Sequence, residues 1–247
     1  MNLLRSDQST LSTDQWNLLS NLLHCYDEHS GLSIGFSYMH EQNVLPIKLR
    51  FKPTSMMNFF LSAVERVQAL YTNNQDSRCL SADDLSTLIQ STMKHTGSLF
   101  LNLIIHQIGL TRQDVFYGNM ETMVNARTAS AINRIQDRLE FDVVVMKLIL
   151  AILSFSTVKL TVYPQTLARN LGNIKQVLCI QDLYIELTWR YLLYRYDSKH
   201  AIVCFSNLIR CLFAVHHGIV IEENLEWYDE KIDSMIEETK KTLVVCN

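Results

Sequence analysis

Apolar residues recur at intervals of three and four along most of the chain, which is the spacing of one face of an α-helix. The first stretch of this kind contains Trp16, Leu19, Leu22, Leu23 and Tyr26. Before it, Ser12 and Gln15 have the spacing of a capping box, and Leu11 and Trp16 have that of a hydrophobic staple. The pattern predicts a helix that starts near Ser12 and buries one broad face.

The same stretch contains the letters LSNLL at Leu19–Leu23, the form of a short L-x-x-L-L docking peptide for nuclear receptors. A docking peptide would lie in a polar tail, and only the first ten residues are of that kind. The spacing of the surrounding apolar residues favours another interpretation, a first helix that packs into the core of its own chain.

The segment Asp27–Pro53 mixes glycines, prolines and polar residues, and it predicts a long surface connection with a functional or mobile role. After it, Thr54 or Ser55 can cap a helix. The apolar face of that helix contains Met57, Phe60, Val64, Val67 and Leu70.

Ser81 and Asp84 repeat the capping pattern before a further helix. From Leu99 to Ile108 almost every residue is apolar, which predicts a helix buried on all sides. Gly109–Asn119 predicts turns or a short hairpin, and Met120–Glu140 predicts one helix or two short ones.

Asp142 is placed to cap an apolar helix over Val143–Phe155. In the next helix, Ile174–Tyr196, the charges form one narrow stripe, so we expect it to be sandwiched between neighbours, with Glu186 paired to Arg190. Asp197 then caps a helix whose apolar face contains Ile202, Phe205, Leu208, Ile209 and Leu212. The last predicted helix, Glu222–Leu243, is acidic at its start and basic at its end.

Taken together, these patterns predict an all-α protein with one domain over residues 1–247. Seven glycines and three prolines are few for 247 residues, which leaves long segments without a helix breaker. Since some helices are apolar on all sides, we expect three stacked layers of about ten antiparallel helices.

Composition excludes several classes of function. The net charge is −3 with no long basic run, so we expect no nucleic-acid contact by this chain. The N-terminus has no signal-peptide pattern and Val143–Phe155 is too short to span a bilayer, so we expect no membrane association. The six cysteines form no C-x-x-C pair and no zinc spacing with the eight histidines, which favours reduced, mostly buried thiols in an intracellular protein.

Four stretches together resemble the nuclear-receptor ligand-binding domain, a three-layer helical sandwich, over nearly the whole chain. LSADDLSTLI at Leu80–Ile89 is similar to the family signature, and DVVVMKLILAILSFS at Asp142–Ser156 is similar to the eighth helix. IQDLYIELTWRYLLY at Ile180–Tyr194 resembles the ninth helix and precedes a tenth with FSNLI at Phe205–Ile209. The opening LSTDQ at Leu11 is similar to the L-T-x-E-Q start of several receptors.

The resemblance implies a transcription regulator in the nucleus, or in cytoplasm and nucleus, with three kinds of site. A cavity for a lipophilic small molecule would be lined by Met57, Phe60, Val64, Phe100, Ile104, Met123, Phe213 and His217. A groove for a coregulator helix of the L-x-x-L-L type would involve Arg66, Lys94 and Glu238. A homodimer or heterodimer interface on the helix Lys199–Val215 would contain Val203, Cys204, Asn207, Arg210 and Cys211.

The sequence departs from the family pattern at several of these positions. Leu85 and Val145 stand where the family usually has Gln and Glu, so buried polar links are lost. Ile104 replaces the Arg that anchors ligands in steroid-type receptors, which argues against a steroid-like polar anchor. Thr239 and Lys240 interrupt the activation motif that begins at Met235, so the last helix should dock weakly. The chain also contains no zinc module for reading DNA.

No motif indicates an enzyme, a metal site or a cofactor. His24 and Cys25 are adjacent on a helix and therefore point to different faces, which favours two ordinary helix residues over a catalytic pair. His216 and His217 end an apolar helix, where a contact with the ligand's polar end and an interaction with the helix dipole are equally good interpretations.

Two hypotheses of function follow. The first is a ligand-responsive regulator domain whose last helix completes a coregulator groove. The second is an interaction domain of the same fold whose large side chains fill the cavity, so that it acts through dimerisation without a ligand.

Overall fold

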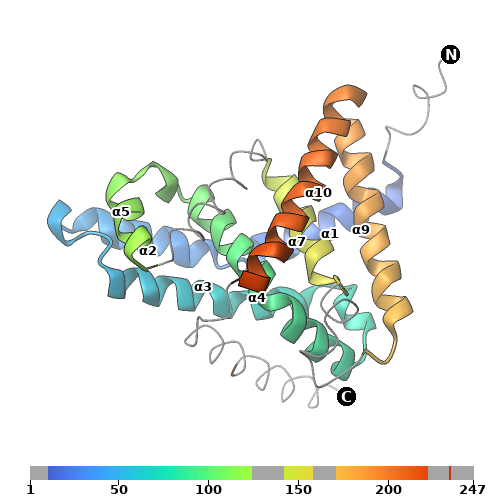
Figure 1. Cartoon of the computed structure of the whole chain (residues 1–247), viewed down its shortest axis with the longest axis horizontal. Coiled ribbons are helices and arrows are strands. Elements are labelled where there is room, and N and C mark those ends of the chain that lie inside the picture. The colour runs from blue at the N-terminus through green and yellow to red at the C-terminus, as the bar shows by residue number, and fades with distance from the viewer. Residues whose placement is uncertain (1–10, 124–141, 158–170, 222–233, 235–247) are drawn as a thin grey trace.

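A computed structural model describes residues 11–123, 142–157, 171–221 and 234 of the chain. Within these ranges the protein contains eight α-helices and three short 3-10 helices, and no strand (Figure 1). The all-α prediction is therefore confirmed for the part of the chain that is described.

The longest helix is α4, Ala82–Gln107, and it runs through the middle of the molecule. The sequence pattern predicts separate apolar segments here, but the structure joins them into one continuous helix of 26 residues. On its sides, α4 packs against α3, Pro53–Asn73, and α7, Val143–Ser154. Every residue from Val145 to Leu153 in α7 is buried. Helices α4 and α7 thus lie together in the core.

Helices on both sides enclose this core. On one side, α1, Thr13–His29, packs against α3 and α7, and α2, Leu32–Val44, packs against α3 and α4. On the other side, α9, Ile174–Arg195, packs against α7. Next to α9 lies α10, Ser198–Ile221, which also contacts α4 and α7 (Figure 1).

The predicted helix starts are confirmed at four places. Ser12 and Gln15 form the reciprocal capping box of α1. Ser81 accepts a hydrogen bond from the third amide of α4, and Asp142 accepts bonds from the amides of Val144 and Val145. Asp197 does the same for the amides of Lys199 and His200. Each cap satisfies amides that have no partner within their own helix.

The letters LSNLL belong to the core, as the spacing of apolar residues predicts. Leu19 and Leu22 lie on the buried face of α1, and Leu23 is partly buried against the same cluster. The interpretation as a free docking peptide is therefore wrong.

Two predicted connections are helical. Asp27–Pro53 contains α2 and the 3-10 helix η1, Ile47–Leu49, instead of one long surface loop. The buried face of α2 is built from Gly35, Tyr38 and Gln42. These residues have helical spacing, but none of them is aliphatic, so the apolar pattern does not predict the helix. Gly109–Asn119 forms the 3-10 helix η3, Leu110–Arg112, and most of α5, Asp114–Met123.

The prediction that α9 is sandwiched between neighbours is also wrong. Leu178, Leu183 and Tyr194 on this helix are exposed to solvent, whereas the opposite face is buried. Glu186 and Arg190 form the expected ion pair, with a distance of 2.8 Å from Oε1 to Nε. The predicted helix beyond Met123 and the last helix, Glu222–Leu243, lie outside the described residues except for Ser234.

A short 3-10 helix, η2, Ser77–Cys79, follows α3. Asp76 and Asn74 in this connection bind the hydroxyl of Tyr184 on α9: the hydroxyl donates to Asp76 at 2.5 Å and accepts from Asn74 at 3.2 Å. This contact ties the end of α3 to α9 across the core.

Candidate functional site

The residues predicted to line a ligand cavity come from α3, α4, α5 and α10. Phe60, Val64, Phe100 and Ile104 are buried, and Met57 is half-buried. Met123, Phe213 and His217 lie in described helices, but the structure describes only their backbone and not their side chains. The structure therefore brings the α3 and α4 members into one apolar core, and the cavity as a whole stays a prediction.

Two of these rings contact different helices. Phe60 on α3 meets Phe116 on α5, with ring centroids 6.4 Å apart and the planes nearly perpendicular. Phe100 on α4 meets Tyr26 on α1 at a centroid distance of 6.4 Å. Such pairs add aromatic contact energy to the burial of the rings. In these two pairs, Phe60 faces α5 and Phe100 faces α1.

Ile104 is packed against α2. A Cβ atom added to Gly35 would lie 2.9 Å from Cγ2 of Ile104 and 3.0 Å from Cγ2 of Ile108. Glycine at position 35 thus allows α2 to approach α4 closely, and Ile104 helps to hold that contact.

A small cavity lies beside Phe100, between α1, α3, α4 and α7. Its volume is about 20 Å³. That is room for a water molecule and far below the several hundred Å³ of a typical small-molecule site. Polar groups at its wall come from Cys25, Tyr26, Asn74, Thr96 and Ser154.

Buried hydroxyl groups are hydrogen-bonded next to this cavity. The hydroxyl of Tyr71 lies 2.8 Å from Oγ1 of Thr92 and 3.1 Å from Oγ1 of Thr96. Burial raises the pKa of Tyr71 above its usual value and that of Tyr26 well above it. Both phenols are therefore neutral at physiological pH, and they act as hydrogen-bonding groups and not as bases.

The neighbouring pair His24 and Cys25 shows no catalytic geometry. Burial raises the pKa of the Cys25 thiol to about 11, so the nucleophilic thiolate is scarce at neutral pH. His24 is exposed and lies 3.3 Å from Glu28, one turn along the same helix. The interpretation of both as ordinary helix residues is consistent with this geometry.

One buried lysine pairs with an exposed carboxylate at the edge of the core. Lys147 of α7 is only 5% exposed, and its ammonium donates a hydrogen bond to Oδ1 of Asp27 on α1 at 2.5 Å. Asp27 itself reaches solvent. A buried ammonium needs such a partner because its desolvation is costly. This pair explains the single lysine that interrupts an otherwise apolar helix.

Asp84 has a role that its position in the sequence does not reveal. Its backbone amide donates to the hydroxyl of Ser81, which completes the cap of α4. Its buried carboxylate accepts hydrogen bonds from the amides of Gly172 at 2.5 Å and Asn173 at 3.2 Å. Since α9 begins at Ile174, one carboxylate joins the starts of two helices.

The predicted coregulator groove is described only at Arg66. This residue is exposed on α3, and its Cβ and Cγ atoms lie beside Gly31, the residue that precedes α2. The side chains of Lys94 and Glu238 lie outside the described residues.

The predicted dimer surface on α10 is accessible where it is described. Val203 is 50% exposed, and its neighbour Ile202 is 58% exposed although the pattern placed it on the core face. Arg210 is exposed, and Cys204 and Asn207 are half-buried. The side chain of Cys211 lies outside the described residues.

A surface groove that apolar spacing does not indicate lies between α2 and α3. It has a volume of about 510 Å³, and Tyr38 and Phe59 stack at its wall with ring centroids 4.5 Å apart. Burial raises the pKa of Tyr38 to about 12. Glu41 and Lys52 also line the groove, which opens next to the connection between the two helices.

Other kinds of site are not found in the part of the chain that is described. It contains no group of three His, Cys, Asp or Glu side chains that could hold a metal ion. None of its helices combines the length and the apolar character needed to cross a membrane. Cys25 is buried as expected, but Cys79 and Cys179 are exposed, so the prediction of mostly buried thiols is wrong for these two. His216 and His217 lie in α10, and their side chains are outside the description.

Comparison of the chain with protein-family models and with curated proteins finds no match. The case for a function therefore depends on the helix arrangement, the chemistry of the side chains and the resemblance of the sequence motifs.

Proposed function

We propose that the chain is the ligand-binding-type domain of a nuclear-receptor-like transcription regulator that acts in the nucleus. In this proposal a lipophilic small molecule binds among α3, α4, α5 and α10. A coregulator helix of the L-x-x-L-L type binds at the surface that includes Arg66, Lys94 and Glu238.

The main support comes from α4 and α7, which other helices enclose. α4 contacts α2, α3, α7 and α10, and α7 contacts α1, α4, α9 and α10. A helix enclosed in this way belongs in the middle layer of a three-layer sandwich. The two motif stretches that resemble the receptor family, Leu80–Ile89 and Asp142–Ser156, fall mainly on these two helices, and this coincidence supports the proposal.

The side chains favour an apolar ligand. Phe60, Val64 and Ile104 offer hydrocarbon surface without a charged group. By the resemblance, Ile104 stands about where steroid-type receptors carry their anchoring Arg. A pocket with such walls would select its ligand by shape and by burial of apolar area.

A second candidate is a dimerisation domain of the same fold that has no ligand. Two observations favour it: the described cavity residues are packed against neighbouring side chains, and Ile202 and Val203 on α10 are exposed. Exposed aliphatic neighbours on one helix suit a symmetric interface between two copies.

Native mass spectrometry of the purified protein separates the two candidates in one measurement. The ligand-binding domain should carry a co-purified lipophile, seen as a mass increment that disappears after denaturation. A dimer without any increment would favour the second candidate. A monomer without an increment that also fails to bind an L-x-x-L-L peptide in fluorescence polarisation would contradict both.

The dimer surface can be tested separately with Arg210→Glu. The change replaces the guanidinium of each copy with a carboxylate, so any hydrogen bond or ion pair that Arg210 makes across the interface is lost and the dimer mass should decrease. Lys175→Glu is the matched control, because Lys175 is an exposed cation at the start of α9, away from the predicted interface. If both variants dissociate equally, the interface is not the one predicted.

A further inference from the structure

The connection between α2 and α3 exposes aliphatic side chains to solvent. We call residues 44–52 the α2–α3 tip. Within it, Val44 is 75% exposed, Ile47 is 68% exposed, Leu49 is 43% exposed and Leu45 is 36% exposed. Single exposed aliphatic residues are common on proteins, but several within six positions form a patch that needs a reason.

The backbone of the tip is fixed by Arg50. Its Nε donates a hydrogen bond to the carbonyl oxygen of Leu45 at 2.8 Å, and its Nη2 donates to the carbonyl oxygen of Asn43 at 3.0 Å. The side chain of Arg50 thereby ties the chain after Pro46 to the two carbonyl groups before it. The exposed aliphatic residues are presented by a defined turn.

Phe51 anchors the other end of the tip in the core. Its side chain is buried against the rings of Tyr38 and Phe116. Its amide donates to Oε1 of the buried Gln42 at 2.6 Å, and its carbonyl accepts from Nδ2 of Asn119 at 2.9 Å. Phe51 has a φ of 54°, a left-handed conformation that is unfavourable for a non-glycine residue and needs such support.

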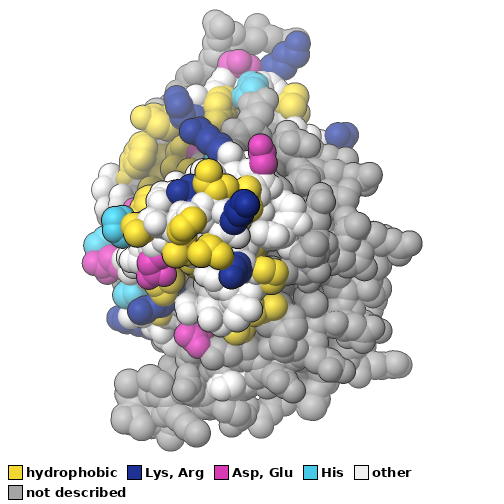
Figure 2. Space-filling model, turned by 90° about the vertical axis from the view of Figure 1, so that its left-hand side faces the viewer, with side chains coloured by type: hydrophobic (Ala, Val, Ile, Leu, Met, Phe, Trp, Pro, Cys, Tyr) yellow, Lys and Arg dark blue, Asp and Glu magenta, His cyan; other side chains and the backbone are white. Residues whose placement is uncertain are grey.

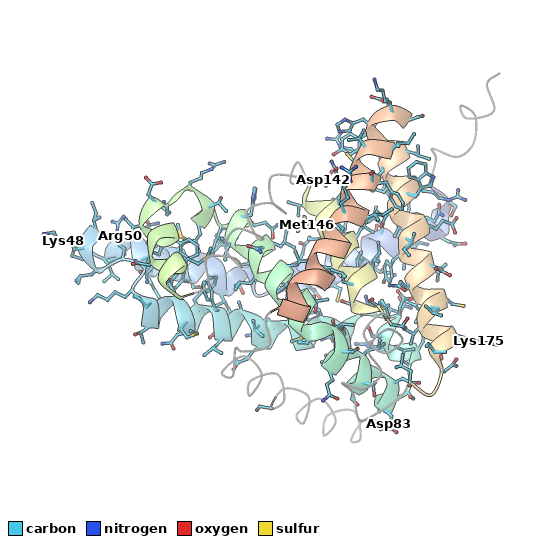
Figure 3. All side chains as sticks on the ribbon, viewed as in Figure 1. Lys48, Arg50, Asp83, Asp142, Met146 and Lys175 are labelled. Atoms are coloured by element: carbon cyan, nitrogen blue, oxygen red, sulfur yellow. The ribbon has the colours of Figure 1, made fainter. Side chains whose placement is uncertain are left out.

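Positive charge accompanies the exposed aliphatic residues. The sequence VLPIKLRFKP at 44–53 contains Lys48, Arg50 and Lys52 and no acidic residue, although the whole chain has a net charge of −3. On the face of the molecule that contains the tip, hydrophobic side chains gather in the middle with Lys and Arg among them (Figure 2). Lys48 and Arg50 lie at one end of the long axis of the molecule (Figure 3).

We propose that the α2–α3 tip docks on the surface of an anionic lipid bilayer. Val44, Ile47 and Leu49 would enter the boundary between headgroups and acyl chains, while Lys48 and Lys52 would meet the lipid phosphates and carboxylates. The contact would be peripheral. It would therefore correct the expectation of no membrane association, which rests on the absence of a signal peptide and of a spanning segment.

The composition and position of the tip favour a bilayer over a protein partner. Protein interfaces concentrate their binding energy in aromatic residues and Arg, usually in well-packed pockets, and they are depleted in Lys. The tip instead combines aliphatic residues with lysines and projects at an end of the molecule, where a flat, deformable surface can receive it.

The tip lies at the opposite end of the molecule from most of α9 and α10 (Figure 1). The proposed membrane contact and the proposed dimer can therefore fail independently.

Sedimentation with vesicles tests the proposal on the full chain. The protein is mixed with vesicles of phosphatidylcholine alone and with an equal mixture of phosphatidylcholine and phosphatidylserine. We expect binding to the anionic vesicles that weakens at high salt, and little binding to the neutral ones. Lys48→Ala should weaken binding about fivefold, and Ile47→Asn about tenfold or more.

Leu183→Asn is the matched control, because Leu183 is also an exposed aliphatic residue, 51% exposed on α9, but lies outside the tip. It should leave vesicle binding unchanged, and circular dichroism should show that all variants keep their helices. Three results would overturn the proposal: no binding by the unmodified protein, undiminished binding by Ile47→Asn, or equal loss in Leu183→Asn. Loss of a protein complex in Ile47→Asn without any vesicle binding would indicate a protein surface instead.

Discussion

The helical core and the α2–α3 tip depart in opposite ways from the usual separation of polar and apolar residues. In the core, charged groups are buried: Lys147 lies within α7, and Asp84 lies beneath the start of α9. At the tip, aliphatic side chains are exposed at Val44 and Ile47. Each buried charge has a specific partner, whereas the exposed aliphatic residues have none among the described residues of the tip.

This difference separates residues that hold the fold from residues that are available for binding. A buried charge must keep its partner, because an unpaired charge in the core costs several kcal/mol. An aliphatic side chain that is exposed in the folded state gains little by folding, so it contributes little to stability. Substitutions should therefore change stability strongly in the core and weakly at the tip.

The largest effect is expected at the tip residue that belongs to the core. Phe51→Ala removes a buried ring and should lower the free energy of unfolding by about 4 kcal/mol. Leu49→Ala, two positions away, should change it by less than about 0.5 kcal/mol because Leu49 is exposed. Urea unfolding followed by circular dichroism measures both. Similar losses in the two variants would mean that the tip is packed throughout.

A second prediction compares the two partners of the ion pair between buried Lys147 and exposed Asp27. Asp27→Ala leaves the ammonium of Lys147 buried without its partner, and it should cost about 3 kcal/mol. Lys147→Met replaces the cation with an apolar side chain of similar volume and leaves Asp27 in contact with water, so it should cost much less. If Lys147→Met were the more damaging change in urea unfolding, the pair would be a net source of stability.

The third prediction compares two adjacent carboxylates. Asp84→Ala removes the acceptor for the amides of Gly172 and Asn173 and should cost about 2 kcal/mol. Asp83 stands one position earlier in the same first turn but is exposed, so Asp83→Ala should cost only a few tenths of a kcal/mol. Hydrogen exchange should show faster exchange at the start of α9 in Asp84→Ala alone. If both variants exchanged equally fast at the start of α9, the loss of a negative charge near the α4 dipole would explain the effect, and the hydrogen bonds of Asp84 would not.

The difference between Asp83 and Asp84 also shows what sequence patterns can and cannot predict about the fold. Helix starts at Ser12, Ser81 and Asp142 could be predicted because a cap involves residues two or three positions apart. The partners of Asp84 lie 88 and 89 positions away, and no local pattern indicates them. Likewise the apolar pattern does not indicate α2, because its buried face contains a glycine and a glutamine in place of aliphatic residues.

For the candidate site, the sequence predicts burial better than it predicts neighbours. Helical spacing correctly indicates that Phe60 and Val64 lie on the inner face of α3. It does not show that Phe100 faces α1 or that Ile104 packs on Gly35, because those contacts depend on how the helices cross. The exposure of the tip residues cannot be predicted for a related reason: the sequence VLPIKL does not indicate which side chains the turn holds in solvent.

The smallest effect concerns the buried hydroxyls of the core at high pH. Burial is the main reason why the folded protein holds the pKa of Tyr184 far above the ordinary value of 10.0, and the nearby carboxylate of Asp76 adds to the shift. The folded state then keeps a proton that the unfolded state loses, so the stability from this group is complete below about pH 10 and falls as the pH rises further. Tyr184→Phe should lower stability at neutral pH by about 1 kcal/mol, through the lost hydrogen bonds, and should make the alkaline decline shallower. Tyr194→Phe changes an exposed ring on the same helix and should leave the decline as it is. Urea midpoints measured from about pH 8 to about pH 11 distinguish the variants, and parallel declines would mean that Tyr184 ionises as easily in the folded chain as in the unfolded one.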